Sequence, residues 1–317
     1  MHQRMKRFLG FAIMCSFILS LIACSNSVNN ESKKEAPKEA KEEAIEVEHA
    51  LGKTVLDKKP EKIVVLEFSY TDALMTLDVQ PIGIADDDDP DLFMDTVREQ
   101  LEDYTSIGSR YEPNIEMISS LQPDLIIADL NHHKNIYDQL NEIAPTIVLD
   151  DHQANYNQML DNYLLIAKAI GKEEEGKDRL EEHNQKIEEA KQKLGDTAIT
   201  VLPTVTNPEG FFAHSDHSYT GSFLTSIGFD DPVKSEDSYP KLSLEQLVET
   251  NPQAIFLLPA TEETIVDEWE KNPLWQEIDA VKNNKVFTVE RRDWALSRGL
   301  IGSEKMIEDI VKHLGEQ

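Results

Sequence analysis

The sequence has very little cysteine, since its 317 residues contain only two, Cys15 and Cys24. Cys15 lies in an apolar run, residues 8–22, that follows a basic start. This run is short for a membrane span and is typical of a cleaved export signal, here assigned to residues 1–23. At most one thiol then remains, which excludes a disulfide framework and leaves packing as the source of stability.

The motifs of common catalytic sites are also missing. The sequence has no Gly-x-Ser-x-Gly elbow, no glycine-rich phosphate loop and no plausible Ser/His/Asp set. Its close histidine pairs, His132 with His133 and His214 with His217, belong to no clear metal-ligand set. The acidic run at 86–89 lacks the glycine and the terminal glutamate of a calcium loop. We therefore expect a binding protein, not an enzyme, with no resident cofactor and no direct metal ligation.

Positive charge is scarce. The chain has 31 Lys and Arg against 60 Asp and Glu, a formal net charge of -29, and loss of the signal removes three further cations and no acid. A field of this sign excludes nucleic acid and anionic lipid surfaces as partners. It also makes each remaining arginine worth locating.

One pattern occurs twice, 129 residues apart, with the same internal spacing. The copies read Ile115-Glu116-x-Ile118 with Pro123 and Ile126, and Leu244-Glu245-x-Leu247 with Pro252 and Ile255. In each copy a polar residue, Asn114 or Ser243, is placed to cap a short helix, and an apolar strand follows the proline. The repeat predicts two similar α/β lobes.

Each copy places one glutamate, Glu116 or Glu245, in the first turn of its helix. A carboxylate there stabilises the positive end of the helix dipole, by about 0.3 to 1 kcal/mol. Alternatively, the two glutamates form a matched pair of exposed acids that docks a two-fold partner. The residues alone leave both interpretations open.

Alternating strands and helices predict a parallel sheet in the first lobe. A long charged stretch with a single apolar stripe predicts one helix of roughly 30 Å between the lobes, so we expect small closure motions. The resulting division is a signal at 1–23, a modified cysteine and tether at 24–46, a first lobe at 47–168, a linking helix at 169–195 and a second lobe at 196–317.

Cys24 closes the sequence Leu21-Ile22-Ala23-Cys24, which resembles the bacterial lipobox. In that motif the thiol is lipidated and becomes the mature N-terminus. The alternative is a chance cysteine beside an ordinary signal. Lipidation would anchor the protein on the extracytoplasmic face of the cell membrane without a span.

Four of the six arginines that follow the signal lie on loops after predicted strands, in both lobes: Arg110, Arg291, Arg292 and Arg298. In so acidic a chain this placement suggests guanidinium groups directed at carboxylates, which arginine binds bidentately. The alternative is pairing with surface acids. Trp294 lies among them and is expected either to wall a pocket or to belong to the core.

Several segments together resemble the solute-binding components of iron-siderophore ABC importers, and most of all the ferric citrate-binding proteins, over roughly residues 45–315. They are 65–69 with 72–74, 81–87, 220–222 with Leu224, 267–275, and 294–295 with 298–299. The resemblance implies two Rossmann-like α/β lobes with central parallel sheets, joined by one long helix, with the ligand in a shallow cleft between them.

The resemblance also implies roles for particular residues. Glu116 and Glu245 match glutamates that pair with arginines of two permease subunits, which work with an ATPase. The expected ligand-binding residues are Arg110, Trp294 and Arg298, with Ser69, Tyr219 and Tyr239 as further hydroxyl or aromatic candidates. Leu296 stands where citrate binders carry another arginine, for which Arg291 or Arg292 is expected to compensate.

The implied cargo is ferric citrate, with the iron carried as a chelate. Another ferric siderophore, hydroxamate or catecholate, is the alternative within this class, followed by haem or a corrinoid. From a different class, a lipid-anchored hydrolase is the distant alternative.

Overall fold

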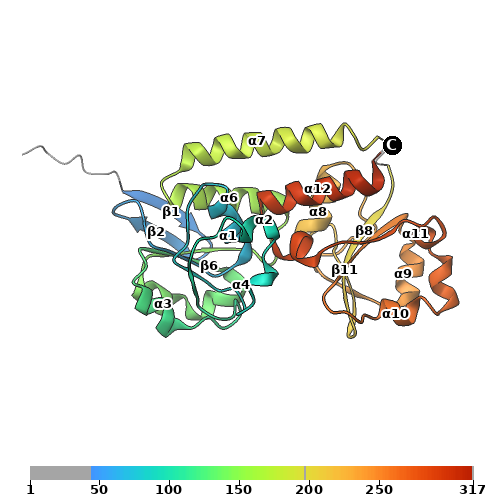
Figure 1. Ribbon diagram of the computed structural model, residues 1–317, viewed down its shortest axis with the longest axis horizontal. Coiled ribbons are helices and arrows are strands. Elements are labelled where there is room, and N and C mark those ends of the chain that lie inside the picture. Colours follow the sequence, from blue (N-terminus) through green and yellow to red (C-terminus); the bar gives the residue numbers. More distant parts are fainter. Residues whose placement is uncertain (1–43, 196–197, 316–317) are drawn as a thin grey trace, which may run out of the picture. The chain divides into compact units, whose positions relative to one another are not determined.

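The computed structural model describes residues 44–195 and 198–315. The signal, Cys24 and almost all of the expected tether lie outside the described residues. The tether was predicted to extend to residue 46, but strand β1 (Ile45–His49) already begins at Ile45 and pairs antiparallel with β2 (Gly52–Leu56). The remaining described strands form two five-stranded sheets, one in each lobe (Figure 1).

The first lobe has a fully parallel sheet in the order β5-β4-β3-β6-β7, as predicted. Its strands are β3 (Ile63–Val65), β4 (Gly83–Ile84), β5 (Thr105–Ser106), β6 (Leu125–Asp129) and β7 (Thr146–Leu149). The central strands are continuous apolar runs because both faces are covered. The chain leaves the sheet in opposite directions at β3 and β6, and ligands of such sheets bind at this switch point.

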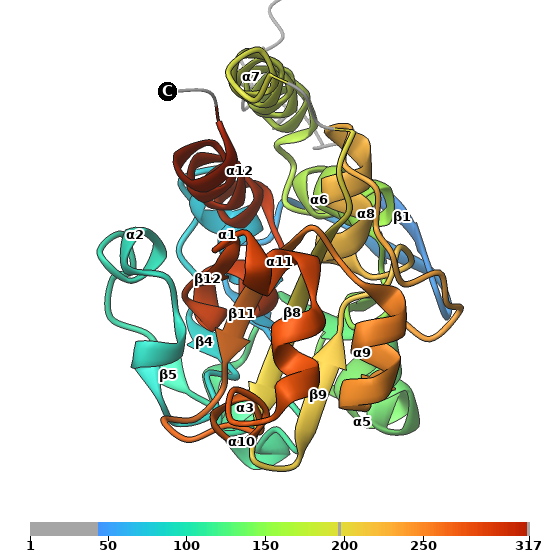
Figure 2. The same cartoon turned by 90° about the vertical axis from the view of Figure 1, so that its right-hand side faces the viewer.

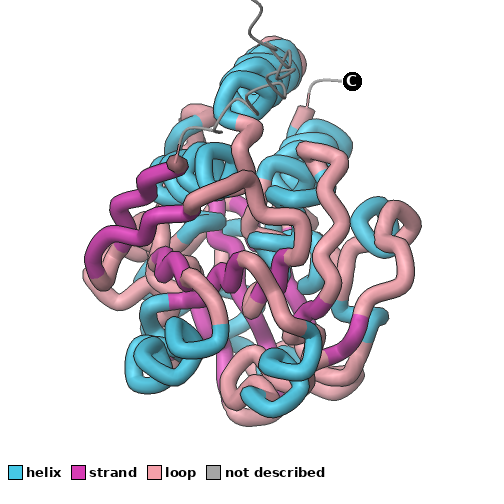
Figure 3. Tube along the Cα trace, turned by 90° about the vertical axis from the view of Figure 1, so that its left-hand side faces the viewer, coloured by secondary structure: helices cyan, strands magenta, loops and turns pink. Residues whose placement is uncertain are grey.

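Helices surround this sheet, as the view toward the first lobe shows (Figure 3). They are α1 (Phe68–Met75), η1 (Pro90–Leu92), α2 (Asp95–Arg98), α3 (Ile115–Leu121), α4 (Leu130–His133), η2 (Lys134–Ile136), α5 (Tyr137–Ile143) and α6 (Tyr156–Ala169). The β1–β2 hairpin joins the sheet edge, where the amide of Ala50 donates to the carbonyl of Val148 over 2.9 Å.

The second lobe repeats the strand order as β10-β9-β8-β11-β12 (Figure 2). Its strands are β8 (Val201–Asn207), β9 (Gly210–Ala213), β10 (Lys241–Leu242), β11 (Ala254–Pro259) and β12 (Val286–Thr288). Strands β8, β11 and β12 are parallel, whereas β9 runs antiparallel to β8. The sequence analysis missed this hairpin, whose turn is held by Asn207 Oδ1 accepting from the amides of Glu209 and Gly210.

The helices of the second lobe are α8 (Tyr219–Ser226), α9 (Leu244–Thr250), α10 (Val266–Trp269), η3 (Pro273–Glu277), α11 (Asp279–Lys282), η4 (Arg292–Leu296) and α12 (Leu300–Leu314). Among all described helices, none combines the length and apolarity that crossing a membrane requires.

The duplicated pattern forms the same unit in both lobes. The side chain of Asn114 caps α3 and that of Ser243 caps α9, as predicted. Each helix ends at a left-handed residue, Gln122 (φ 51°) or Asn251 (φ 43°), directly before the proline. A buried strand, β6 or β11, follows each copy.

The predicted linking helix is α7 (Glu173–Lys191), which lies beside both lobes (Figure 1). It is shorter than the expected 169–195 because the chain turns at Gly171, with φ at +67°. Gly176 lets α7 approach α6, since a Cβ there would lie 2.4 Å from Ala167. Farther along α7, Arg179 (2.7 Å) and Lys186 (2.8 Å) donate to Glu304 of α12.

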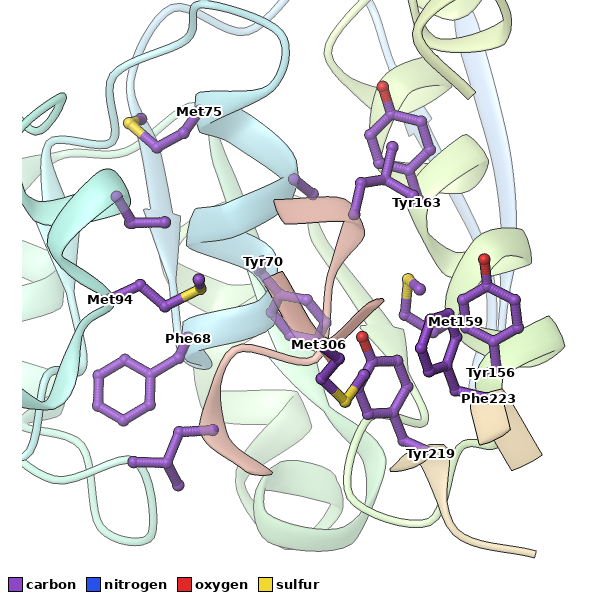
Figure 4. Packing of buried hydrophobic residues seen from close by; sticks show 14 of the residues in the cluster. Phe68, Tyr70, Met75, Met94, Tyr156, Met159, Tyr163, Tyr219, Phe223 and Met306 are labelled. Atoms are coloured by element: carbon purple, nitrogen blue, oxygen red, sulfur yellow. The ribbon is translucent and has the colours of Figure 1, made fainter. Parts of the chain in front are cut away.

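A single hydrophobic cluster continues from one lobe into the other. Figure 4 shows Tyr70 of α1, Tyr156 of α6, Tyr219 of α8 and Met306 of α12 gathered in it. The buried carboxylate of Asp72 on α1 also accepts from the Gly302 amide (3.0 Å) at the start of α12. This shared core is consistent with small lobe motions, which remain a prediction.

Candidate functional site

A cavity of about 180 Å³ lies between the lobes, at the carboxyl ends of the strands. Both lobes line it through Arg110, Tyr111, His132, His152, Val205, Phe212, His214, Tyr239, Arg291, Ala295, Leu296 and Arg298. Three of the four arginines singled out in the sequence therefore converge here. The arrangement follows from the repeated strand order, which brings the switch points of two sheets to face one another.

Arg110 is held on all sides by the first lobe. Its Nε and Nη2 donate to Asp87 Oδ2 over 3.0 and 2.7 Å, and its Nη1 donates to Glu67 Oε2 over 3.3 Å. The guanidinium carbon lies 4.2 Å from the centre of the Phe68 ring, a cation–π contact. Asp87 also accepts from the Arg110 amide (2.8 Å), so loop and side chain are fixed together.

Arg298 crosses from the second lobe to the first. Its Nη2 forms an ion pair with Asp151, which follows β7, and its Nη1 donates to the Ala295 carbonyl over 3.2 Å. Both partners of the ion pair are buried, with 8% and 4% of the side chains exposed. A buried pair of this kind fixes the relative orientation of two elements, because neither charge tolerates separation there.

Arg291 differs from these two because it forms no ion pair within the described chain. The other described arginines pair with carboxylates, among them Arg98, Arg179 and Arg292. The Nε of Arg291 is buried and has no hydrogen-bond partner. Burial lowers the pKa of Arg291, and the nearby charges of Arg110 and Arg298 act in the same direction. Arg291 is thus the open cation of the cavity.

A continuous series of rings crosses the cavity wall from one lobe to the other. Successive ring centres are 4.7 Å apart for Tyr111 and His132, 5.2 Å for His132 and His152, 5.6 Å for His152 and Tyr239, and 5.0 Å for Tyr239 and His214. Burial lowers the pKa of His214 to about 3, so this ring is neutral at physiological pH. The wall is therefore aromatic between the arginines, and it is uncharged at its His214 end.

Glu67, Asp129 and His132 place one ligand atom each within 4.8 Å of one another, a spacing that a metal ion would accept. These atoms already have partners. His132 Nδ1 is 2.9 Å from Glu67 Oε1, and Asp129 accepts from the amides of His132 (2.8 Å) and Asp151 (2.9 Å). The hydrogen bond to Glu67 raises the pKa of His132. The cluster fits a network that positions Arg110 and the loops around it.

His133, the other member of the histidine pair, has a structural role. Its Nδ1 accepts from the Asp129 amide (2.9 Å), which leaves Nε2–H to donate to the Arg110 carbonyl (2.7 Å). Burial lowers its pKa to about 4, so the ring is neutral and holds the Arg110 loop against β6.

Trp294 does not line the cavity and occupies a core position, which was the alternative to walling a pocket. Its side chain is fully buried and stacks on Phe256 with ring centres 4.6 Å apart. Its Nε1 donates to Asp309 over 3.1 Å, on the side of α12. The short helix η4 turns the next residues, Ala295 and Leu296, toward the cavity instead.

Three other candidates also lie outside the cavity. Ser69 donates to Asp151 and is buried beneath the Arg298 pair. Tyr219 is a core residue whose hydroxyl donates to the Gly299 carbonyl over 3.1 Å. Arg292 pairs with Asp95 across the lobes (2.9 Å) and does not line the cavity, whereas Arg291 does. Arg110, Arg291, Arg298 and Tyr239 are where the sequence analysis expected them, at the cleft.

Sequence analysis missed the rings Tyr111, His132, His152 and His214, together with Val205 and Phe212. His132 and His214 were considered only as metal ligands, His152 was not considered, and no repeating pattern distinguishes a wall residue from a core residue. The one available signal was proximity, because Tyr111 is the neighbour of Arg110.

Glu116 and Glu245 lie away from the cavity, exposed in the first turns of α3 and α9. Backbone N–H groups and Ser243 at the start of α9 lower the pKa of Glu245. Glu116 borders a groove of about 800 Å³ between α3 and α5, which Gln139 and Glu142 also line. Both glutamates are thus accessible to a partner.

Residues 63–292 match the family model described as Periplasmic binding protein. The Fe(3+)-citrate-binding protein YfmC of Bacillus subtilis is 41% identical over 305 residues, which cover 95% of this chain and 96% of that protein. The putative ABC transporter substrate-binding lipoprotein YhfQ of the same species is 36% identical, covering 95% and 97%.

Among solved structures, Staphylococcus aureus SirA complexed with staphyloferrin B has a TM-score of 0.76 to this chain at 27% identity. The match covers 85% of this chain and 98% of SirA. The likeness extends over both lobes, and it confirms the two-lobe α/β fold.

Proposed function

Because the chain belongs to the periplasmic binding protein family, whose members bind solutes and do not catalyse reactions, we propose that it captures ferric citrate outside the membrane and delivers it to an ABC importer for iron uptake. The observation that carries this proposal is the convergence of three arginines on one cavity, with Arg291 unpaired. In a chain with a formal charge of -29, an arginine left without a carboxylate partner in this cavity favours an anionic ligand.

Ferric citrate suits the cavity because citrate carboxylates occupy the coordination sphere of the iron and present further oxygens outward. Guanidinium groups bind such oxygens through charge-assisted hydrogen bonds. The cavity wall thus needs no iron ligand of its own. The likeness to a Fe(3+)-citrate-binding protein supports the same cargo.

Delivery requires a permease, and we propose that Glu116 and Glu245 dock it. The two glutamates occupy equivalent positions on equivalent helices, one in each lobe, as a partner with two-fold pseudo-symmetry requires. Complementary arginines on the two permease subunits would pair with them, while an ATPase drives the transport. Lipidation of Cys24 would keep the receptor beside this permease, and the likeness to a substrate-binding lipoprotein supports it.

The purified full chain titrated calorimetrically with ferric citrate, free citrate, a ferric catecholate and the neutral ferric trihydroxamate ferrichrome tests the cargo. Saturable binding of ferric citrate at micromolar or lower concentration, with weaker binding of free citrate, is the expected result. If only the catecholate or ferrichrome gives saturable binding, that chelate and not ferric citrate is the cargo. The assignment to the family would still stand.

Another ferric siderophore is the second candidate, favoured by the likeness to a structure that contains staphyloferrin B. Its anionic oxygens would meet the same arginines. The two cargoes separate by competition, because a chain that prefers ferric citrate releases the other chelate when ferric citrate is added at equal concentration.

A further inference from the structure

Two of the three cavity arginines already carry a carboxylate from the chain itself. Asp87 binds the Nε and Nη2 edge of Arg110, one of the two edges through which a guanidinium binds a carboxylate bidentately. Asp151 binds Nη2 of Arg298. Only Arg291 presents a guanidinium without such a partner among the described residues.

The carboxylates near the cavity offset its arginines. Glu67 and Asp87 contact Arg110, and Asp151 contacts Arg298, so three acids stand beside three arginines. The charge of Asp87 also reaches Arg291, on which it acts in the opposite direction to Arg110. A cavity built for maximal attraction of anions would omit these acids. Their presence limits the negative charge that the site accommodates.

We propose that Asp87 and Asp151 are resident carboxylates that set the charge selectivity of the cavity, by occupying Arg110 and Arg298 and leaving Arg291 as the open anchor for one carboxylate of the cargo. This inference rests on the proposed function. It assigns a specificity role to two acids that do not themselves line the cavity.

The geometry favours Asp87 as the adjustable member. Its side chain is 19% exposed, whereas that of Asp151 is 4% exposed and also accepts from Ser69. Asp87 has a left-handed backbone, with φ at +59°, which asparagine adopts readily. Asp87→Asn therefore suits the left-handed backbone, keeps one of the two side-chain oxygens that accept from Arg110, and removes one negative charge.

A matched control is the adjacent residue. Asp88 has φ at +55°, is exposed and contacts Ser106 instead of an arginine. Asp88→Asn changes the net charge by the same amount, one residue away, without releasing a guanidinium. Any general effect of charge on the whole acidic surface must appear in both variants.

The experiment measures the dissociation constant of ferric citrate at low and high salt for the full-length wild type, Asp87→Asn, Asp151→Asn and Asp88→Asn. Removing a unit charge beside the cavity is expected to tighten binding on the order of tenfold at low salt, with a steeper salt dependence. Asp88→Asn should change affinity by less than about twofold, because its charge is more exposed and better screened.

Thermal unfolding of each variant separates selectivity from folding. Tighter binding in Asp87→Asn and in a folded Asp151→Asn supports the inference. Unchanged or weaker binding in Asp87→Asn, or an equal gain in Asp88→Asn, overturns it. If wild type fails to bind ferric citrate at all, the proposed cargo is wrong, whereas normal wild-type binding with no gain in Asp87→Asn rejects the resident-carboxylate inference alone.

Discussion

The two lobes share a strand order and a duplicated helix, yet they differ in how they hold charge at the cavity. The first lobe surrounds Arg110 with Asp87 and Glu67, so its cation is neutralised locally. The second lobe sends Arg298 across to the first lobe and leaves Arg291 unpaired. One lobe thus supplies a fixed, balanced surface and the other an open charge. Two lobes of equivalent fold therefore contribute different charge arrangements to the same cavity.

The largest effect is expected from charge reversal of the two glutamates that we propose to dock the permease, one on each lobe. These variants test the feature that the two lobes share. Glu116→Lys with Glu245→Lys should lower iron uptake by about two orders of magnitude, because each lysine would face a cation of the permease. Uptake of labelled iron in cells measures this. Ferric citrate affinity should stay unchanged.

The control is reversal of two exposed glutamates outside α3 and α9, Glu99→Lys with Glu308→Lys, which should leave uptake near wild type. Each single reversal should cost a similar amount if the lobes dock equivalently. Intact uptake in the double reversal would remove the docking assignment.

The two lobes also differ in how they hold α7. Charged contacts attach this helix to α12 of the second lobe, and close packing attaches it to α6 of the first lobe. Hydrogen bonds from His183, Lys186 and Arg179 lower the pKa of Glu304 to about 2, against the opposing effect of burial. A depressed carboxyl pKa adds stability above the unfolded-state pKa, near 4.3, and this stability is lost as pH falls toward 2.

Glu304→Gln should therefore lower the free energy of unfolding by about 3 kcal/mol at pH 7, with the deficit shrinking below about pH 4. Denaturant unfolding at a series of pH values measures it, and Glu308→Gln on the exposed face of α12 is the control. A deficit independent of pH would mean that shape, not charge, holds α7 to α12.

Removing the open cation tests the difference between the lobes directly. Arg291→Ala should weaken ferric citrate binding by about thirtyfold, the loss of one charge-assisted contact. Arg292→Ala, which removes the neighbouring arginine outside the cavity, should change affinity by less than about twofold. Equal losses in the two calorimetric titrations would show that only the overall charge of this loop matters.

The smallest effect on ferric citrate binding is expected from substitution of Trp294. This residue tests whether a core side chain can be distinguished from cavity side chains of the same segment. Trp294→Phe should destabilise the fold by about 1 to 2 kcal/mol, through lost volume and the lost hydrogen bond to Asp309. Ferric citrate affinity in the folded variant should remain within about twofold of wild type, since the indole does not reach the cavity. A selective loss of affinity without destabilisation would return Trp294 to the binding site.

Much of the fold could be predicted because it follows from local chemistry. The caps Asn114 and Ser243, the prolines after each repeat and the apolar strands are all readable from spacing, and the repeat led directly to two lobes. The β9 hairpin could not be read in this way, since its antiparallel return depends on an Asn207 turn that resembles any other polar loop.

The candidate site could be predicted only in part. Arg110, Arg291 and Arg298 were found because cations are rare in this chain and follow strands. Which of them is free could not be seen, because Asp87, Asp151 and Glu67 approach through tertiary contacts across 23 to 147 positions. Trp294 and Arg292 lie outside the cavity although their neighbours line it, because the short helix η4 directs successive side chains to different sides.

The most direct test of the account is a crystal structure of the chain with ferric citrate, with iron located by its anomalous scattering. The account predicts iron in the cavity between the lobes, coordinated by citrate oxygens, with a citrate carboxylate on Arg291. Iron bound directly to Glu67, Asp129 and His132, or a chelate bound away from Arg291, would contradict it.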